Sequence, residues 1–204
     1  QRQMCIRDSL KDSQTRINLM RSFAGESQAR NRYTYAAEAA KSQSLHVIEA
    51  VFKFTANQEK EHGKIFYNFL KEMTGENITI DGSYPVDIYD DVLKLLRSAQ
   101  HNEFEEFEPV YPDFAAVANQ EGFTNIGAKF NQIAKIEKTH GDRFGMFADL
   151  LEQGKLFVSD VEEEWMCLNC GYVHKSSEAP KSCPVCSHPQ GYFVRLKLAP
   201  FTTL

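Results

Sequence analysis

The chain contains two copies of one pattern of residues that could bind a metal. The pattern is Phe-x6-Glu-x2-His-x3-Phe, and its copies comprise Phe52, Glu59, His62 and Phe66, and then Phe130, Glu137, His140 and Phe144. On a helix, Glu and His three residues apart project from the same side, about one turn apart. The phenylalanines extend that side into an apolar stripe, so each copy aims a carboxylate and an imidazole into a core.

Charged groups in such a position need a partner. An ionised carboxylate buried without one costs several kcal/mol, so it must be paired, protonated or bound to a metal. A single Glu-x2-His spacing arises readily by chance. Two copies in the same register with flanking phenylalanines favour a shared metal site.

Single glutamates on other helices complete the expected site. Glu26 precedes Glu59 by 33 residues and Glu103 precedes Glu137 by 34. One Glu from each of two helices, with Glu-x2-His from each of the other two, is the documented arrangement of ferritin-like di-iron and di-manganese proteins. Four carboxylates and two imidazoles suit a pair of iron or manganese ions.

The helical wheel of the acidic third helix indicates a fifth carboxylate. Glu106 lies about 60° from Glu103, whereas Glu105 and Glu108 lie on the opposite side and should face solvent. We therefore include Glu106 in the predicted site. Two tyrosines are expected either to fill the core or to donate a hydrogen bond to a ligand carboxylate; these are Tyr33 and Tyr111.

The C-terminal part carries a second candidate metal site. Two Cys-x2-Cys pairs comprise Cys167, Cys170, Cys183 and Cys186. A turn-forming residue, Gly171 or Ser187, follows each pair, so each pair can fold as a knuckle around a metal. Four thiolates in a tetrahedral array suit iron or zinc, and the spacing does not decide between these metals.

Helical periodicity and break signals divide the rest of the chain. We expect helices over about 15–42, 45–73, 87–122 and 124–153, with a longer connection over 76–86. Pro109 and Pro112 would ordinarily stop the third helix. Its apolar face continues through both, so we predict one kinked helix. The predicted fold class is an all-α four-helix bundle followed by a small four-cysteine metal domain with short β-strands.

The predicted boundaries give four segments. Residues 1–8 lack an initiator Met at position 1 and show no periodicity, so we interpret them as non-native or disordered. Residues 9–153 form the bundle, 154–164 a linker and 165–204 the metal domain.

Composition excludes several classes of partner. A net charge of -5 without a Lys/Arg block argues against nucleic acid or an anionic membrane as the main partner. No apolar run approaches the length needed to span a bilayer. No signal-peptide apolar core follows the N-terminus either, so we expect a cytoplasmic protein. In such a chain the spacing of four of the five cysteines suggests metal binding more than disulfides.

With both sites located, the chain closely resembles the rubrerythrin family from Ser9 to about Phe193. The motifs that carry the resemblance are Gly25-Glu26-Ser27-Gln28-Ala29-Arg30-Asn31-Arg32-Tyr33, the two Glu-x2-His motifs, Glu103-x2-Glu106 before Tyr111-Pro112, and the four-cysteine module. The resemblance implies a ferritin-like bundle with a non-haem di-iron site. It also implies a rubredoxin-like domain with one mononuclear iron.

The resemblance also implies ligand roles. Glu59 and Glu137 would bridge the irons, Glu26 and Glu103 would be terminal ligands, and His62 and His140 would complete one iron each. Glu106 would take an extra ligand position and exchange with His62 as the redox state changes.

The implied function is peroxidase activity in oxidative-stress defence: reduction of hydrogen peroxide to water by the diferrous pair. Electrons would pass through the iron tetrathiolate centre from an NAD(P)H-dependent rubredoxin reductase. Rubrerythrins are similar in pairing head to tail, so a homodimer or a higher homo-oligomer is expected.

Two alternatives stay open. The first is a ferroxidase or iron-storage protein that uses the same bundle, although a cage-forming ferritin has no need of a tethered electron relay. The second is an iron or redox sensor whose four cysteines form a zinc ribbon.

Overall fold

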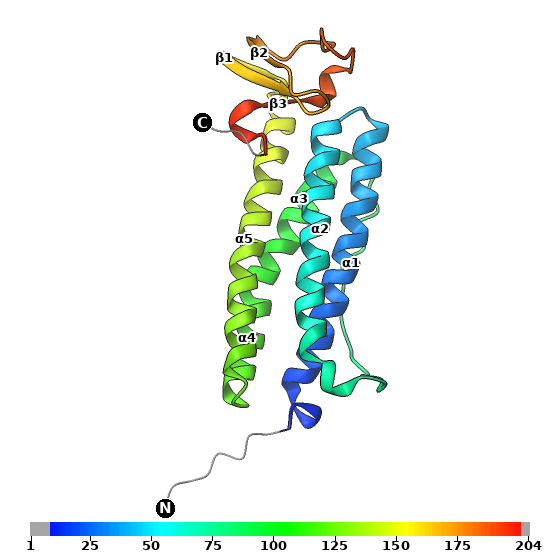
Figure 1. Cartoon of the computed structure of the whole chain (residues 1–204), viewed down its shortest axis with the longest axis vertical. Coiled ribbons are helices and arrows are strands. Elements are labelled where there is room, and N and C mark those ends of the chain that lie inside the picture. The colour runs from blue at the N-terminus through cyan, green and yellow to red at the C-terminus, as the bar shows by residue number, and fades with distance from the viewer. Residues whose placement is uncertain (1–8, 201–204) are drawn as a thin grey trace, which may run out of the picture.

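The computed structural model describes residues 9–200, so the interpretation of residues 1–8 lies outside it. Its long helices are α1 (Gln14–Ser42), α2 (His46–Phe69), α3 (Val92–Glu105), α4 (Tyr111–Gln120) and α5 (Thr124–Glu152). A 3-10 turn, Lys71–Met73, replaces the predicted last turn of α2. In the upright bundle of Figure 1, α1 packs mainly on α2, while α3 and α4 follow one another along α5. The predicted ferritin-like bundle is confirmed.

The third helix begins later than predicted. Asp91 accepts a hydrogen bond of 2.8 Å from the backbone N–H of Leu93, so this side chain caps a helix that starts at Val92. The predicted start, Asp87, lies in the preceding segment. The Asp87 carboxylate instead forms a 2.8 Å ion pair with Arg32 of α1.

The prediction of one continuous third helix is wrong over residues 106–110. A π-helical segment, Glu106–Val110, joins α3 to α4, and within it Glu108 has the extended dihedrals φ -156° and ψ 116°. The cause is Pro109, because a proline disfavours the α conformation of the residue before it. Pro112 is harmless, since it lies in the first turn of α4, where its missing N–H would have no partner in the helix.

Two apolar clusters fill the bundle above and below its centre. The cluster nearer the C-terminal domain includes Tyr33, Phe52 and Phe144, and the other includes Phe66, Tyr111 and Phe130. Every phenylalanine of the sequence repeat is fully buried. Since Glu59 and His62 lie between Phe52 and Phe66 on α2, the repeat places the polar groups in the layer between the clusters.

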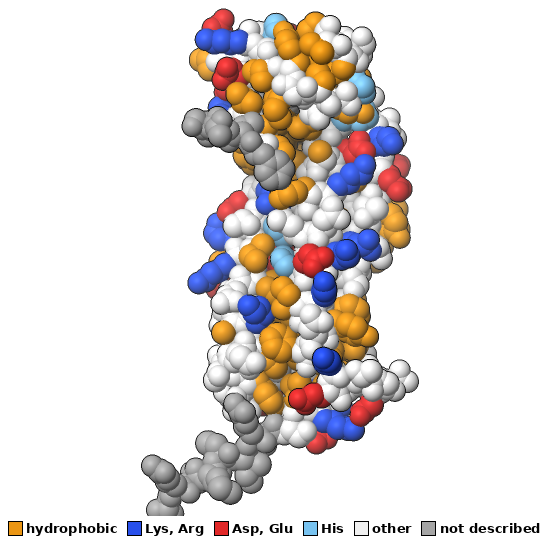
Figure 2. Space-filling model, viewed as in Figure 1, with side chains coloured by type: hydrophobic (Ala, Val, Ile, Leu, Met, Phe, Trp, Pro, Cys, Tyr) orange, Lys and Arg blue, Asp and Glu red, His pale blue; other side chains and the backbone are white. Residues whose placement is uncertain are grey.

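The outer face shows the seam between the two helix pairs. Figure 2 shows a row of hydrophobic side chains between α5 and α2, with charged side chains of both signs around it. Within residues 9–200, none of the helices combines the length and the hydropathy required to cross a bilayer.

A small antiparallel sheet follows the bundle. Its strands are β1 (Val158–Cys167), β2 (Val173–Glu178) and β3 (Phe193–Arg195), in the order β2-β1-β3. Trp165 of β1 is opposite His174 and Arg195, and it is fully buried in a small core with Phe193 and the cysteines. Strand β1 begins inside the segment that we assigned to a linker, and the domain boundaries stay a proposal.

The sheet domain is docked on the end of the bundle (Figure 1). Arg195 donates hydrogen bonds to the carbonyl oxygens of Lys155 at 2.7 Å and Val158 at 2.9 Å. Tyr192 stacks on His46 at the start of α2, with ring centroids 4.1 Å apart. A Cβ on Gly191 would lie 1.8 Å from the Ser44 carbonyl oxygen, so only glycine permits this close approach.

Candidate metal centres

Six of the predicted ligands converge in the layer between the two apolar clusters. They come from four helical elements, and each is at most 6% exposed. These residues are Glu26 on α1, Glu59 and His62 on α2, Glu103 on α3, and Glu137 and His140 on α5.

The six side chains form two overlapping groups. One comprises Glu26, Glu59, His62 and Glu137, and the other comprises Glu59, Glu103, Glu137 and His140; within each, the ligand atoms lie within 4.8 Å of one another. Glu59 and Glu137 belong to both groups. Two carboxylates shared between two sets of four ligands are the geometry that a pair of adjacent metal ions needs.

Contacts between these residues confirm how closely they converge. His62 Nδ1 lies 3.0 Å from a Glu137 carboxylate oxygen and 3.1 Å from one of Glu59. His140 Nδ1 lies 2.9 Å from one oxygen of each of the same two glutamates. The two imidazole rings are nearly parallel, with centroids 5.6 Å apart.

Several buried polar atoms of this cluster have no aligned hydrogen-bond partner among residues 9–200. They include both nitrogens of His140, both carboxylate oxygens of Glu137, and one oxygen each of Glu26, Glu59 and Glu103. His140 is thus close to three carboxylates, those of Glu59, Glu103 and Glu137, without forming an aligned hydrogen bond to any of them. Buried polar groups are nearly always satisfied in proteins, so this set fits bound metal ions.

The electrostatics of the cluster also call for positive charge. Burial opposes protonation of the histidines, but the surrounding carboxylates raise the pKa of His140 to about 12 and that of His62 to about 9. Against its burial, the two imidazoles lower the pKa of Glu59 to about 2. Burial and the negative charge of Glu59 raise the pKa of Glu103 to about 8, and burial and like charges raise that of Glu26. Metal ions would supply the charge that protons supply otherwise.

Two tyrosines hold the outer carboxylates. The Tyr33 hydroxyl donates a hydrogen bond to Glu103, and the Tyr111 hydroxyl donates one to Glu26. Both tyrosines are buried, and both lie where the expected hydrogen bonds require them. The two halves of the bundle therefore support their terminal glutamates in the same way.

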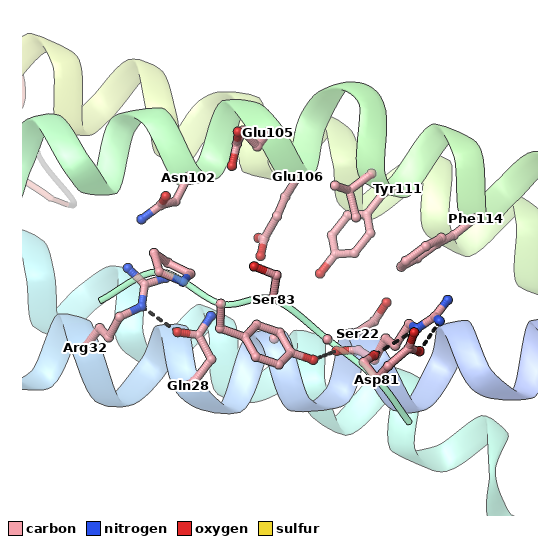
Figure 3. A pocket seen from close by; sticks show the side chains of 16 residues that line it. Ser22, Gln28, Arg32, Asp81, Ser83, Asn102, Glu105, Glu106, Tyr111 and Phe114 are labelled. Atoms are coloured by element: carbon pink, nitrogen blue, oxygen red, sulfur yellow. Dashed lines mark hydrogen bonds and ion pairs between the residues drawn. The ribbon is translucent and has the colours of Figure 1, made fainter. Parts of the chain in front are cut away.

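Glu106 is the predicted ligand that the structure places apart from the others. It is half-buried and belongs to neither group of ligands. Its carboxylate points into a cavity of about 510 Å³ that reaches the surface (Figure 3). A Cβ added to Gly25 would lie 3.9 Å from a Glu106 oxygen, so this acid borders the site at the residue next to Glu26.

The wall of this cavity includes a segment that sequence reasoning described only as a connection. Asp81 forms an ion pair with Arg21 of α1, and the Tyr84 hydroxyl donates a 3.0 Å hydrogen bond to the Arg21 carbonyl oxygen. These contacts hold residues 81–85 across the cavity. An irregular segment has no periodicity, so no pattern in the sequence could have placed it there.

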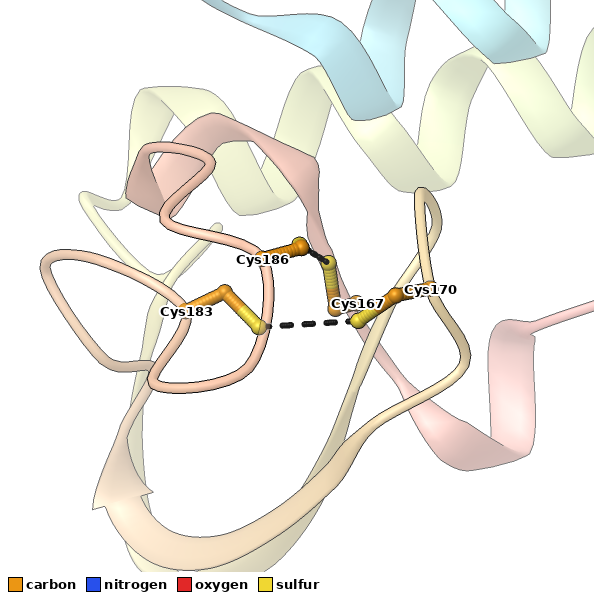
Figure 4. Close-up of side chains that lie close together, drawn as sticks. All are labelled: Cys167, Cys170, Cys183 and Cys186. Atoms are coloured by element: carbon orange, nitrogen blue, oxygen red, sulfur yellow. Dashed lines mark hydrogen bonds between the residues drawn. The ribbon is translucent and has the colours of Figure 1, made fainter.

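The four cysteines form the second centre (Figure 4). All four are free thiols whose sulfur atoms lie within 4.8 Å of one another. Backbone N–H groups of Gly171 and Ser187 donate 2.8 Å bonds to the first cysteine carbonyl of each pair, and both residues have positive φ angles, 76° and 61°. The backbone N–H of His188 lowers the pKa of Cys186 to about 6. Although the Tyr172 N–H opposes it, desolvation and the neighbouring thiols raise the pKa of Cys170 to about 12, as expected when close thiols share negative charge.

These features define a ferritin-like bundle with a dinuclear carboxylate and histidine site, joined to a four-thiolate domain. A family model described as Rubrerythrin matches residues 18–148, and one described as Rubrerythrin, rubredoxin-like domain matches residues 165–194. The chain belongs to the rubrerythrin family.

Individual relatives agree with this assignment. The chain is 46% identical to a rubrerythrin of Clostridium perfringens over 91% of its own length and 95% of the relative's. It is also 46% identical to a rubrerythrin of Porphyromonas gingivalis, covering 93% of both chains. A mixed-valence nigerythrin structure superposes with a TM-score of 0.60 at 27% identity, covering 90% of each chain.

The family gives the two centres their metals. The bundle cluster corresponds to the di-iron site of rubrerythrins, and the four cysteines correspond to their rubredoxin-like iron site. The orphaned polar atoms and the converging thiols fit these groups.

Proposed function

We propose that this protein is a peroxidase that reduces hydrogen peroxide to water. Because the chain belongs to the rubrerythrin family, it is an oxidoreductase of oxidative-stress defence. It has a di-iron site and a rubredoxin-like domain. The observation that carries the finer proposal is that one chain contains both a site for two metal ions and a four-thiolate site. Such a combination suits an enzyme whose two-metal site uses two electrons together, while its four-thiolate site delivers electrons one at a time.

The ligand roles are part of this proposal. Glu59 and Glu137 bridge the two irons, since they are shared by both groups of ligands, and Glu26 and Glu103 are terminal. His62 completes one iron and His140 the other. Glu106 is the extra ligand suggested by the family resemblance, and its position beside Gly25 supports a role in exchange with His62.

The chemistry is the addition of two electrons and two protons to the peroxide, which breaks its O–O bond and gives two waters. When bound, a ferrous pair supplies both electrons together. Glu106 is suited to hold a proton at the cavity, because burial and the negative charge of Glu103 raise its pKa. It would donate that proton to a peroxide oxygen as a general acid.

The distance between the centres supports delivery of electrons from another copy of the chain. His46, on which Tyr192 stacks, lies 16 residues before His62 on α2, which is about 24 Å of helix. The four-cysteine centre is therefore far from the di-iron site of its own bundle. We propose a head-to-tail homodimer in which each rubredoxin-like domain serves its partner's bundle.

The electron donor in this proposal is an NAD(P)H-dependent rubredoxin reductase. A cytoplasmic location stays a prediction that cell fractionation would test.

The decisive assay is peroxide-dependent oxidation of NADH by iron-loaded protein with a rubredoxin reductase. We expect turnover by wild type, loss of relayed turnover in Cys170→Ser, and a reduced rate in Glu106→Ala. Glu108→Ala is the matched control, because this acid of the same segment is exposed, does not line the cavity and should leave the rate unchanged. If Cys170→Ser consumes peroxide through the chain as fast as wild type, the relay is wrong.

Iron storage is the alternative function for a bundle of this fold. A Desulfovibrio desulfuricans bacterioferritin structure shares the fold, with a TM-score of 0.59 at 20% identity over 68% of this chain. Accumulation of an iron core without peroxide turnover would support storage. A colourless four-cysteine domain that contains zinc would favour the other alternative, an iron or redox sensor.

A further inference from the structure

The cavity beside Glu106 is much larger than hydrogen peroxide requires. It lies between α1, residues 81–85, the π-helical segment and the start of α4, and has a volume of about 510 Å³ (Figure 3). A water molecule takes about 30 Å³ of liquid volume, so a two-oxygen peroxide would fill only a small part of the space. Pockets of about 300–1,000 Å³ are those that bind organic ligands.

One part of the cavity wall suits an organic group. Tyr84, Pro85, Val110 and Phe114 contribute apolar surface, with the Phe114 ring near one end of the cavity in Figure 3. The wall is fixed, since the Tyr84 hydroxyl is bonded to the Arg21 carbonyl oxygen at 3.0 Å.

The inner end of the cavity is polar and adjoins the di-iron site. Glu106 and Tyr111 point into it in Figure 3, and Tyr111 is bonded to Glu26. Ser22 lines the same space, is only 3% exposed, and its hydroxyl has no hydrogen-bond partner within the described part of the chain. It precedes Glu26 by four residues on α1, so the two side chains lie on the same helix face.

We propose that this cavity binds an organic hydroperoxide, R–O–O–H, with its organic group against Phe114 and its oxygens near Ser22 and Glu106. This inference rests on the proposed peroxidase function and extends its substrate class. Two electrons, taken from the same ferrous pair, and two protons break the O–O bond and give the alcohol R–O–H and one water. The unpartnered Ser22 hydroxyl bonds an oxygen of the bound molecule.

Binding can be measured without turnover. Equilibrium dialysis of oxidised, iron-loaded protein with cumyl alcohol, an unreactive product analogue, should show saturable binding. Ser22→Leu fills the cavity and should weaken binding at least about tenfold. Tyr84→Ala, at a side chain that is 39% exposed, removes apolar wall without threatening the core and should also weaken binding. Absence of saturable binding to wild type would overturn the inference.

Turnover separates this inference from the function on which it rests. With cumene hydroperoxide in the NADH assay, Tyr84→Ala should raise KM, while its hydrogen peroxide turnover stays near that of wild type. Turnover of hydrogen peroxide but not of cumene hydroperoxide would overturn this inference alone. Failure of wild type with both peroxides would overturn the peroxidase proposal and this inference with it.

Discussion

Tyr33 and Tyr111 perform equivalent tasks in the two halves of the site. Each buried hydroxyl donates to a glutamate that belongs to only one of the two groups of ligands, Glu103 for Tyr33 and Glu26 for Tyr111. Among residues 9–200, no tyrosine hydroxyl donates to either shared glutamate. The tyrosines therefore orient the outer ligands and leave Glu59 and Glu137 free to respond to the metals.

Replacing Tyr33 with Phe should test this support. The ring packing against Phe52 and Phe144 would be kept, but a buried carboxylate oxygen would lose its donor, which costs about 1–3 kcal/mol. We expect a lower midpoint of thermal unfolding and lower iron occupancy, measured by metal analysis. Tyr35→Phe on the same helix is the control, because Tyr35 is 64% exposed. Equal stability of both variants would contradict a supporting role.

Metal-free protein should depend on pH in a defined direction. The folded pKa of His62, about 9, and that of His140, about 12, exceed the ordinary value of 6.5, so their contribution to stability is complete below about pH 6.5 and is lost as pH rises. Glu103, with a folded pKa of about 8, adds to the loss, since its unfolded form ionises at lower pH. Thermal unfolding should show falling stability of the metal-free bundle between about pH 6.5 and 9. An increase in stability over this pH range would contradict the raised pKa values of these three groups.

Periodicity was sufficient to find the six converging residues, but it did not show that Glu106 lies apart from them. The wheel places Glu106 about 60° from Glu103, at the edge of the ligand face, and there its side chain borders the neighbouring cavity. Glu105 and Glu108 are exposed as predicted. The cavity that Glu106 borders depends on an irregular segment, and no local pattern encodes its path.

Helix ends and interruptions are where the element boundaries departed from prediction. The apolar face of the third helix continued through both prolines, so the pattern gave the correct direction of the chain but not the extended residue Glu108. Its start was misplaced because several acids precede the helix, and only contacts decide which of them is the cap.

Asp91→Ala should therefore destabilise the bundle by about 1 kcal/mol, the usual effect of losing an N-cap. Asp91 accepts from the backbone N–H groups of Leu93 at 2.8 Å and Lys94 at 3.4 Å. Chemical denaturation measures the change, and Asp90→Ala at the neighbouring position is the matched control. A larger effect at Asp90 would show that the cap has been assigned to the wrong residue.

The chain as a whole holds its two metal centres at fixed but distant positions. Docking of the rubredoxin-like domain extends the core of the bundle, with Leu156 and Val194 joining the apolar cluster around Phe52. Arg195 secures the joint through two carbonyl oxygens and lies over the Trp165 ring, 5.0 Å from its centroid. The sequence predicted both units, but their relative placement depends on contacts between residues far apart in the chain.

Arg195→Ala should loosen this joint. We expect faster cleavage between the domains in limited proteolysis, because the carbonyl oxygens of Lys155 and Val158 lose their donor. Lys197→Ala is the control, since Lys197 is exposed and forms a 2.6 Å ion pair with Glu163 within the sheet domain. Unchanged cleavage in Arg195→Ala would show that the remaining contacts suffice to hold the domain.

The central claim is that one peroxide takes both of its electrons from the bundle site. The most direct test is anaerobic titration of fully reduced, iron-loaded protein with hydrogen peroxide, followed by Mössbauer spectroscopy and a hydroxyl-radical trap. We expect one equivalent of peroxide to take both electrons from the ferrous pair without trapped radical. The rubredoxin-like ferrous iron should then turn red as it returns one electron to the oxidised pair. Oxidation of one iron per peroxide with trapped radical would contradict it.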